Sequence, residues 1–212
     1  MKILLASGAP LETWPQIERK YDLYIGVDRG SLFLLNLGFP LELAIGDFDS
    51  LSNEEKKFVL RQAKHVQTAP AEKDDTDSQL ALAYIFEHYP DAEVTFVGAT
   101  GGRIDHFLAN LWMVLEPRFL PYCQQLTLKD KGNTICFLSP GIHEIKREND
   151  MTYLAYCCLT PVDKLTLTES KYTLDNQNVS RPTSYASNEF VGNKAKISFT
   201  KGMVAVIQSK DS

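Results

Sequence analysis

Residues 42–64, ELAIGDFDSLSNEEKKFVLRQAK, decide the fold of the first half of the chain. The stretch begins with a short apolar run at 42–45 that fits a buried strand, continues through an aspartate-rich turn, and enters a helix expected over 56–64. Ser52 and Glu55, three residues apart, form a capping box, which marks the start of a helix. A strand that leads through a turn into a helix is the building unit of a parallel α/β sheet.

The same order of strand, polar cluster and helix recurs through the first half. Strands are expected over 2–6, 23–27 and 93–97, and a cluster of Gly, Asp or Ser follows each of them. Thr76 and Gln79 form a second capping box, ahead of a helix over 80–88. A third helix has apolar residues at the spacing of one buried face and ends at Pro117; these residues are Ile104, Phe107, Leu108, Leu111 and Leu115.

After about residue 121 the pattern changes to alternating polar and apolar residues rich in Thr, Tyr and Val. Turn residues recur at strand-length intervals, which is typical of a small antiparallel sandwich or barrel. We therefore expect an N-terminal Rossmann-like α/β domain with a mostly parallel sheet over 1–122. An antiparallel β domain is expected over 123–212.

Composition excludes several classes of protein. The 212 residues are 44% hydrophobic, which is enough for a packed core, and a net charge of -5 gives no reason to expect a nucleic acid or an anionic membrane as partner. No apolar stretch approaches the roughly 20 residues of a membrane helix. The start, MKILLASG, is typical of a first core strand rather than a signal peptide. A cytoplasmic protein is expected.

The four cysteines and four histidines do not form a zinc motif. The cysteines lack C-x-x-C spacing and are expected to be buried thiols, and the histidines are scattered. Any metal ion is therefore expected to be held by oxygen ligands.

Four polar clusters hold nearly all the unusual composition of the first half. Each lies after an expected strand or before an expected helix, so an α/β fold could gather them at the carboxyl edge of its sheet. They are Gly26-Val-Asp28-Arg29-Gly30, Gly46-Asp47-Phe48-Asp49-Ser50, Lys73-Asp74-Asp75-Thr76-Asp77 and Gly98-Ala-Thr100-Gly101-Gly102-Arg103-Ile-Asp105.

The acidic clusters suggest a magnesium site. In extended backbone, Asp47 and Asp49 would point the same way, and Mg²⁺ is the ion that binds one or two carboxylates together with substrate phosphates. The alternative for this pair is an Asx turn that starts a loop. In the third cluster, Asp77 with Asp74 or Asp75 would complete a metal or substrate site, whereas the alternative is a well-capped, solvated helix start.

The glycine-rich loop at 98–102 can bring bare backbone N–H groups to a phosphate. It matches neither the P-loop nor the G-x-G-x-x-G dinucleotide pattern. Arg103 adds a cation whose fork matches phosphate oxygens, and Asp105 adds a carboxylate. Arg29 could serve the same way or lie on the surface. Together these residues favour group transfer from a nucleoside triphosphate carried with Mg²⁺.

In these four clusters the sequence resembles the thiamine pyrophosphokinase family. The resemblance continues into the second half, at Lys171-Tyr172-Thr-Leu174 and Ser187-Asn188-Glu189-Phe190. It implies an enzyme that transfers pyrophosphate from ATP to the hydroxyl of thiamine, giving thiamine diphosphate and AMP. It also implies an N-terminal domain that binds ATP and Mg²⁺, a C-terminal β-sandwich, and thiamine bound where two subunits of a homodimer meet.

The resemblance assigns site residues as follows. Asp47, Asp49 and Asp77 would bind Mg²⁺ and take part in catalysis, and Asp28 occupies a further acidic position. ATP and its phosphates fall to Asp28, Arg29, Thr100, Gly101, Gly102, Arg103 and Asp105. Thiamine falls to Tyr172, Ser187 and Asn188, although Tyr172 could instead be a packed strand residue. Two rival functions stay open, namely pyrophosphorylation of another small alcohol such as a hydroxymethylpterin, and a non-catalytic nucleotide or thiamine sensor.

Overall fold

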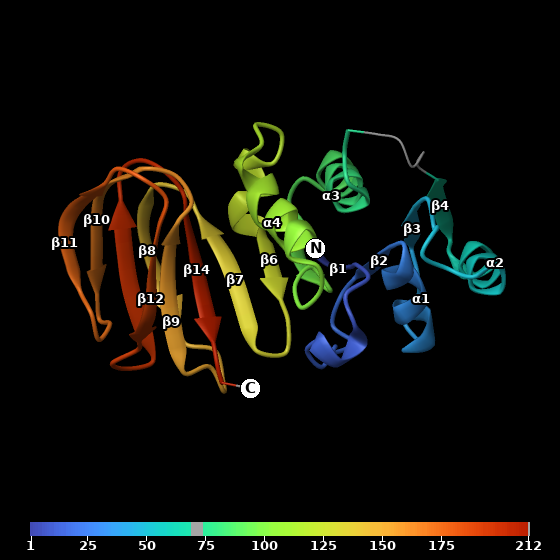
Figure 1. The fold of residues 1–212 in the computed structure, drawn as a ribbon, viewed down its shortest axis with the longest axis horizontal. Coiled ribbons are helices and arrows are strands. Elements are labelled where there is room, and N and C mark those ends of the chain that lie inside the picture. The colour runs from blue at the N-terminus through green and yellow to red at the C-terminus, as the bar shows by residue number, and fades with distance from the viewer. Residues whose placement is uncertain (69–73, 212) are drawn as a thin grey trace. The chain divides into compact units, whose positions relative to one another are not determined.

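The computed structural model describes residues 1–68 and 74–211. The chain divides into two compact units, Met1–Lys131 and Gly132–Ser212 (Figure 1). This division lies later in the chain than the expected boundary at 122/123. The reason is the strand Leu126–Lys129 (β6), which pairs in parallel with Glu93–Val97 (β5) and so belongs to the N-terminal sheet. The sequence pattern of β6 had placed it in the β-rich half.

The N-terminal unit contains a parallel sheet. Its strand order is β6-β5-β1-β2-β3-β4, and every pair is parallel. Three strands, β1, β2 and β5, have the expected bounds. The sequence of β4 gave no recognisable strand signal, because its residues are exposed. Besides β5 and β6, the strands of this sheet are β1 (Lys2–Ala6), β2 (Leu23–Val27), β3 (Leu43–Gly46) and β4 (His65–Thr68).

Helices connect these strands, and both capping boxes are present. Ser52 caps α2 and Thr76 caps α3, each with the reciprocal side-chain bond from the residue three positions later. The helix after β2 was not predicted. The helices are α1 (Arg29–Asn36), α2 (Asn53–Gln62), α3 (Asp77–His88) and α4 (Ile104–Trp112), with 3-10 turns η1 (Leu11–Thr13), η2 (Met113–Leu115) and η3 (Leu120–Gln125).

The third expected helix differs from its prediction. The α-helix ends at Trp112 and continues as η2, and its apolar stripe is only partly buried: Ile104 is exposed, whereas Phe107, Leu108, Leu111 and Leu115 are half-buried. Ile104 is 74% exposed and Trp112 is 52% exposed, whereas the buried residue of α4 is polar, Asn110. The apolar spacing therefore marks a face that the N-terminal unit covers only in part.

The C-terminal unit is a sandwich of two antiparallel four-stranded groups, β12-β9-β14-β7 and β11-β10-β13-β8. One core joins them, with Tyr156 and Val206 from the first group and Leu165 and Ile197 from the second. Figure 1 shows this unit in yellow to red, built from strands. They are β7 (Asn133–Leu138), β8 (Gly141–Lys146), β9 (Tyr153–Cys158), β10 (Val162–Thr168), β11 (Leu174–Val179), β12 (Thr183–Glu189), β13 (Lys194–Phe199) and β14 (Val204–Ser209).

All four cysteines are free thiols; Cys123 and Cys158 are buried, as expected, whereas Cys136 and Cys157 are half-buried. Among the described residues, no helix has the length and apolar character needed to cross a membrane.

Removing the cap of α2 should destabilise the N-terminal unit measurably. Ser52 accepts a hydrogen bond from the N–H of Glu55 and its own N–H donates to the Glu55 carboxylate. Ser52→Ala should lower the free energy of unfolding by about 1 kcal/mol in urea denaturation. Ser180→Ala, at an exposed serine between β11 and β12, is the matched control and should stay within about 0.5 kcal/mol of wild type. Equal values for the two variants would contradict the capping role.

Candidate active site

A cavity of about 700 Å³ lies at the carboxyl ends of the parallel strands of the N-terminal unit. Residues from all four predicted clusters line it, as does the loop after β1. Parallel strands place their C-terminal loops at one edge of a sheet, which explains how clusters far apart in the sequence meet. The convergence expected from the sequence is therefore present.

The loops after β2 and β3 interlock around Asp28. The Oδ1 atom of Asp28 accepts a hydrogen bond of 3.1 Å from the N–H of Phe48. Asp28 and Phe48 both have positive φ, 46° and 59°, which non-glycine residues rarely adopt. A Cβ atom on Gly46 would lie 1.9 Å from Asp28 Oδ1, so only glycine leaves room for this carboxylate. The two turns are thus fitted to each other.

Asp47 and Asp49 lie in a turn and not in extended backbone. Asp47 Oδ1 accepts a 2.9 Å hydrogen bond from the N–H of Asp49, so the Asx turn named as the alternative is formed. The side chain of Asp49 lines the cavity and is exposed, whereas Asp47 is half-buried and does not line it. Lys56 donates to the backbone carbonyl of Asp47 at 2.7 Å and so holds the turn against α2.

The electrostatics of Asp28 show that the carboxylates lie near one another. Its pKa is raised from 3.8 to about 6, and burial is the largest cause. The hydrogen bond from Phe48 opposes this shift. Three further carboxylates, those of Asp77, Asp47 and Asp49, raise the pKa because their negative charges disfavour ionisation of Asp28. A cation placed among these groups would relieve that repulsion.

The aspartates in and next to the acidic loop before α3 have different surroundings. Asp74, Asp75 and Asp77 all line the cavity, and Asp77 occupies the first turn of the helix. Both oxygens of Asp75 accept hydrogen bonds from Arg118, which lowers the pKa of the Asp75 carboxyl. Lys73, the first residue of the predicted cluster, lies outside the described residues.

The glycine loop after β5 approaches the loop after β1 closely. Gly98 has φ of 70°, and a Cβ atom there would lie 2.3 Å from the carbonyl oxygen of Ser7. The Ser7 hydroxyl donates to the Gly98 carbonyl at 2.6 Å. Thr100 and Gly102 line the cavity, and the Thr100 hydroxyl donates to Asp130 at 2.5 Å. Gly101 lies beside Thr13 and is not a lining residue.

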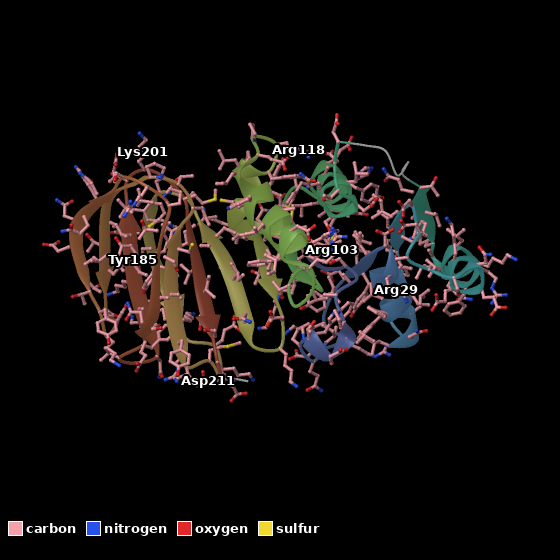
Figure 2. The ribbon with its side chains drawn as sticks, viewed as in Figure 1. Arg29, Arg103, Arg118, Tyr185, Lys201 and Asp211 are labelled. Atoms are coloured by element: carbon pink, nitrogen blue, oxygen red, sulfur yellow. The ribbon has the colours of Figure 1, made fainter. Side chains whose placement is uncertain are left out.

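The two arginines expected to meet phosphate come from different helix starts, as Figure 2 shows for Arg29 and Arg103. Both line the cavity. Arg29 donates to the backbone carbonyl of Ser50 and so links α1 to the acidic turn. Arg103 pairs with Asp105 through hydrogen bonds of 3.1 and 2.5 Å, and both side chains are more than half exposed. Asp105 itself does not line the cavity.

Sequence reasoning missed several lining residues. Ser7, Gly8, Ala9 and Pro10 follow the first strand, and His106 comes from the first turn of α4. The sequence could have indicated residues 7–10, because a Ser-Gly pair follows the first predicted strand in the same way as polar or glycine residues follow the other strands.

The carboxylates fit a hard divalent cation that also contacts substrate phosphates. Within residues 1–68 and 74–211 no three His, Cys, Asp or Glu side chains are close enough to hold a metal ion by themselves. Mg²⁺ characteristically uses one or two carboxylates and takes its other ligands from water and phosphate. Asp49 and Asp77 at the cavity wall, with Asp47 and Asp28 near them, provide such a donor set.

In the C-terminal unit the three predicted thiamine residues form one local structure. Asn188 is buried, and its side chain accepts from the N–H of Tyr172 at 2.9 Å and donates to the Tyr172 carbonyl at 2.8 Å. The ring of Tyr172 is 59% exposed, so it is not the packed strand residue of the alternative. Ser187 is exposed at a bulge of β12 and has φ of 58°. The side-chain amide of Asn188 thus fixes the backbone of Tyr172 through both its oxygen and its nitrogen.

A parallel α/β sheet whose strand-end loops gather carboxylates, arginines and a glycine turn around one cavity is typical of phosphate-transferring α/β enzymes. Comparison with known proteins narrows this class. The family description "Thiamin pyrophosphokinase, catalytic domain" matches residues 14–123, and "Thiamin pyrophosphokinase, vitamin B1 binding domain" matches residues 142–204. The chain belongs to the thiamin pyrophosphokinase family.

Individual relatives agree with this assignment. The thiamine pyrophosphokinase of Bacillus subtilis (strain 168) is 34% identical over 215 residues, covering 99% of each chain. The crystal structure of a thiamin pyrophosphokinase family protein from Enterococcus faecalis is 54% identical, with a TM-score of 0.97 over 100% of both chains. The crystal structure of the Bacillus subtilis enzyme gives a TM-score of 0.85 at 32% identity, again over 100% of both chains. The expected fold, α/β followed by a β-sandwich, is confirmed.

The raised pKa of Asp28 predicts a pH-dependent stability difference in metal-free protein. Because the folded pKa of about 6 lies above that of the unfolded chain, the protonated carboxyl stabilises the fold at low pH and this contribution is lost as pH rises through about 6. Asp28→Asn keeps an oxygen for the Phe48 N–H and does not titrate. The variant should therefore gain stability relative to wild type between pH 4 and 7, in urea unfolding. A difference that does not change with pH would contradict the assignment.

Proposed function

We propose that this protein transfers the terminal pyrophosphate of ATP to the hydroxyl of thiamine and releases AMP. The observation that carries the proposal is the single cavity in which a glycine loop, two arginines and several aspartates meet at the carboxyl edge of a parallel sheet. Such a site suits a polyphosphate, because arginine and backbone N–H groups bind its oxygens while carboxylates hold the accompanying cation. Family membership supplies thiamine as the acceptor.

The N-terminal unit binds ATP with Mg²⁺ in this proposal. Asp49 and Asp77 would hold the ion, with Asp47 near them, and the charge of the ion would favour ionisation of the half-buried Asp28. When bound, Mg²⁺ neutralises charge on the phosphates. The ATP phosphates would contact Thr100, Gly102 and the two arginines, which line the cavity.

The reaction is an in-line displacement at the β-phosphorus. The thiamine hydroxyl oxygen forms a bond to this atom, the bond to the oxygen bridging the α- and β-phosphorus breaks, and AMP leaves with that oxygen. The hydroxyl proton passes to solvent or to an aspartate. Arg29 and Arg103 stabilise charge on the phosphate oxygens, and the loop backbone at 98–102 positions them, so charge stabilisation and positioning supply most of the acceleration.

The C-terminal unit supplies the thiamine contacts in this proposal. The exposed ring of Tyr172 offers a face to the cationic thiazolium or the flat pyrimidine, and Ser187 lies exposed on the neighbouring strand. Asn188 contributes by fixing the backbone of Tyr172. Asp105 contributes by orienting Arg103, to which it is hydrogen bonded.

A homodimer in the cytoplasm completes the proposal. The apolar residues Ile104 and Trp112 of α4 are exposed, and a second copy of the chain would cover them. The four free thiols fit a reducing compartment.

Asp49→Asn tests the proposed catalytic site. The variant keeps the size of the side chain and the exposed turn, but loses the charge that would face the cation, so turnover should fall by about 100-fold or more. AMP and thiamine diphosphate are separated by chromatography after incubation with ATP, thiamine and Mg²⁺. Asp91→Asn, at an exposed aspartate between α3 and β5, is the control and should keep wild-type turnover.

Each result of this assay has a definite meaning. Wild-type protein should form AMP and thiamine diphosphate in equal amounts, and a chelator should stop both. Near-normal turnover of Asp49→Asn would remove Asp49 from the site. AMP without thiamine diphosphate would favour another alcohol as acceptor, and nucleotide binding without either product would favour the sensor.

Tyr172→Ala should weaken thiamine binding selectively. Loss of the ring should raise the KM for thiamine about 10-fold, in line with the strength of an aromatic contact to a cation, while the KM for ATP stays unchanged. Tyr172→Phe retains the ring and should behave as wild type. An unchanged thiamine KM in Tyr172→Ala would contradict the stacking role.

A further inference from the structure

A closed set of hydrogen bonds joins the acidic loop before α3 to the segment that follows η2. It involves Asp75, Thr76 and Gln79 on one side and Glu116 and Arg118 on the other. These two segments are about 40 residues apart in the chain, since 43 residues separate Asp75 from Arg118. The connection therefore fixes where the loop lies on the N-terminal unit.

Arg118, labelled in Figure 2, is central to this set because its guanidinium bonds to both Asp75 and Glu116. Its Nη1 donates to Asp75 Oδ2 at 2.7 Å and its Nη2 to Asp75 Oδ1 at 2.6 Å, so the pair is bidentate. Its Nε donates to Glu116 at 2.8 Å. Two parallel charge-assisted bonds constrain orientation more than a single-contact surface ion pair does.

Glu116 connects Arg118 to the start of α3. The other carboxylate oxygen of Glu116 accepts a 2.5 Å bond from Gln79 Nε2, and Gln79 Oε1 accepts from the N–H of Thr76 at 2.7 Å. Gln79 and Thr76 are the capping box of α3. Asp77, the first residue of α3, directly follows the cap residue Thr76, so this cap holds its backbone.

The carboxylate of Asp75 is paired with a cation of the same chain. Both of its oxygens are bonded to Arg118, whose positive charge lowers the pKa of the Asp75 carboxyl. Asp77, in contrast, raises the pKa of Asp28 and so acts electrostatically on the acidic site. The two carboxylates have separate roles although both line the cavity.

We infer that Arg118 is a positioning residue that anchors the acidic loop through Asp75, so that Asp77 faces the cation site while Asp75 is withheld from it. This inference rests on the proposed function, because the cation and nucleotide belong to that function. Anchoring residues behind metal ligands typically change metal affinity or activity by 10- to 100-fold when they are lost.

The test measures cation-dependent nucleotide binding without turnover. Calorimetry with a non-hydrolysable ATP analogue, over a series of Mg²⁺ concentrations and with no thiamine present, gives the half-saturating Mg²⁺ for each variant. Arg118→Gln and Asp75→Asn should each raise this value about 10-fold, and the double variant should match the single ones, since both remove the same pair. Arg118→Lys, which keeps the charge without the fork, should fall between Arg118→Gln and wild type.

Two controls separate anchoring from other effects. Arg61→Gln, at an exposed arginine in the last turn of α2, should leave the half-saturating Mg²⁺ unchanged. Thermal unfolding of each variant shows whether it is folded at the temperature of the binding experiment, and Arg118→Lys provides the comparison if Arg118→Gln is not.

Two results would overturn the inference. If Arg118→Gln binds as Arg61→Gln does, the pair is an ordinary surface contact. If Asp75→Asn abolishes Mg²⁺-dependent binding while Arg118→Gln does not, Asp75 is itself a cation ligand. Failure of wild-type protein to make thiamine diphosphate would instead refute the proposed function, and because the binding experiment contains no acceptor, the two failures are distinguishable.

Discussion

Mutual repulsion among aspartates at the carboxyl edge of the sheet is the constraint on which the site depends. Asp28 is partly buried within electrostatic reach of three other carboxylates; burial raises its pKa most, and the three negative charges raise it further. The fold holds these charges in place with backbone geometry: positive φ at Asp28 and Phe48, and a glycine at 46 whose missing side chain makes room. Lys56 and Arg29 then bind the turn through its carbonyl oxygens. In the proposed function, a divalent cation bound together with phosphate would offset this repulsion.

The helix starts and the meeting of the four clusters could be predicted from the sequence, because short local patterns determine them. The capping boxes at Ser52 and Thr76 form as predicted, since each needs only residues three positions apart. The convergence of the four clusters followed from the rule that parallel strands present their C-terminal loops at one edge. The family resemblance then supplied the acceptor, which no local pattern identifies.

The failures share a different cause, namely dependence on distant parts of the chain. The apolar spacing of α4 indicates a face but not what covers it, and Ile104 is exposed. The alternation in β6 is the same for a parallel as for an antiparallel neighbour, and its actual partner is β5. Asp47 and Asp49 lie in a turn because Phe48 bonds to Asp28, twenty residues earlier. The pairing of Asp75 with Arg118 has no sequence signature at all.

The most direct test of the account follows the phosphorus atoms. Protein is incubated with thiamine, Mg²⁺ and ATP carrying label at either the β- or the γ-phosphorus, and the products are separated. The account predicts that both labels appear in thiamine diphosphate, with one AMP formed per molecule. Label transferred from the γ-position alone, with ADP as the second product, would contradict displacement at the β-phosphorus and with it the proposed arrangement of ATP in the cavity.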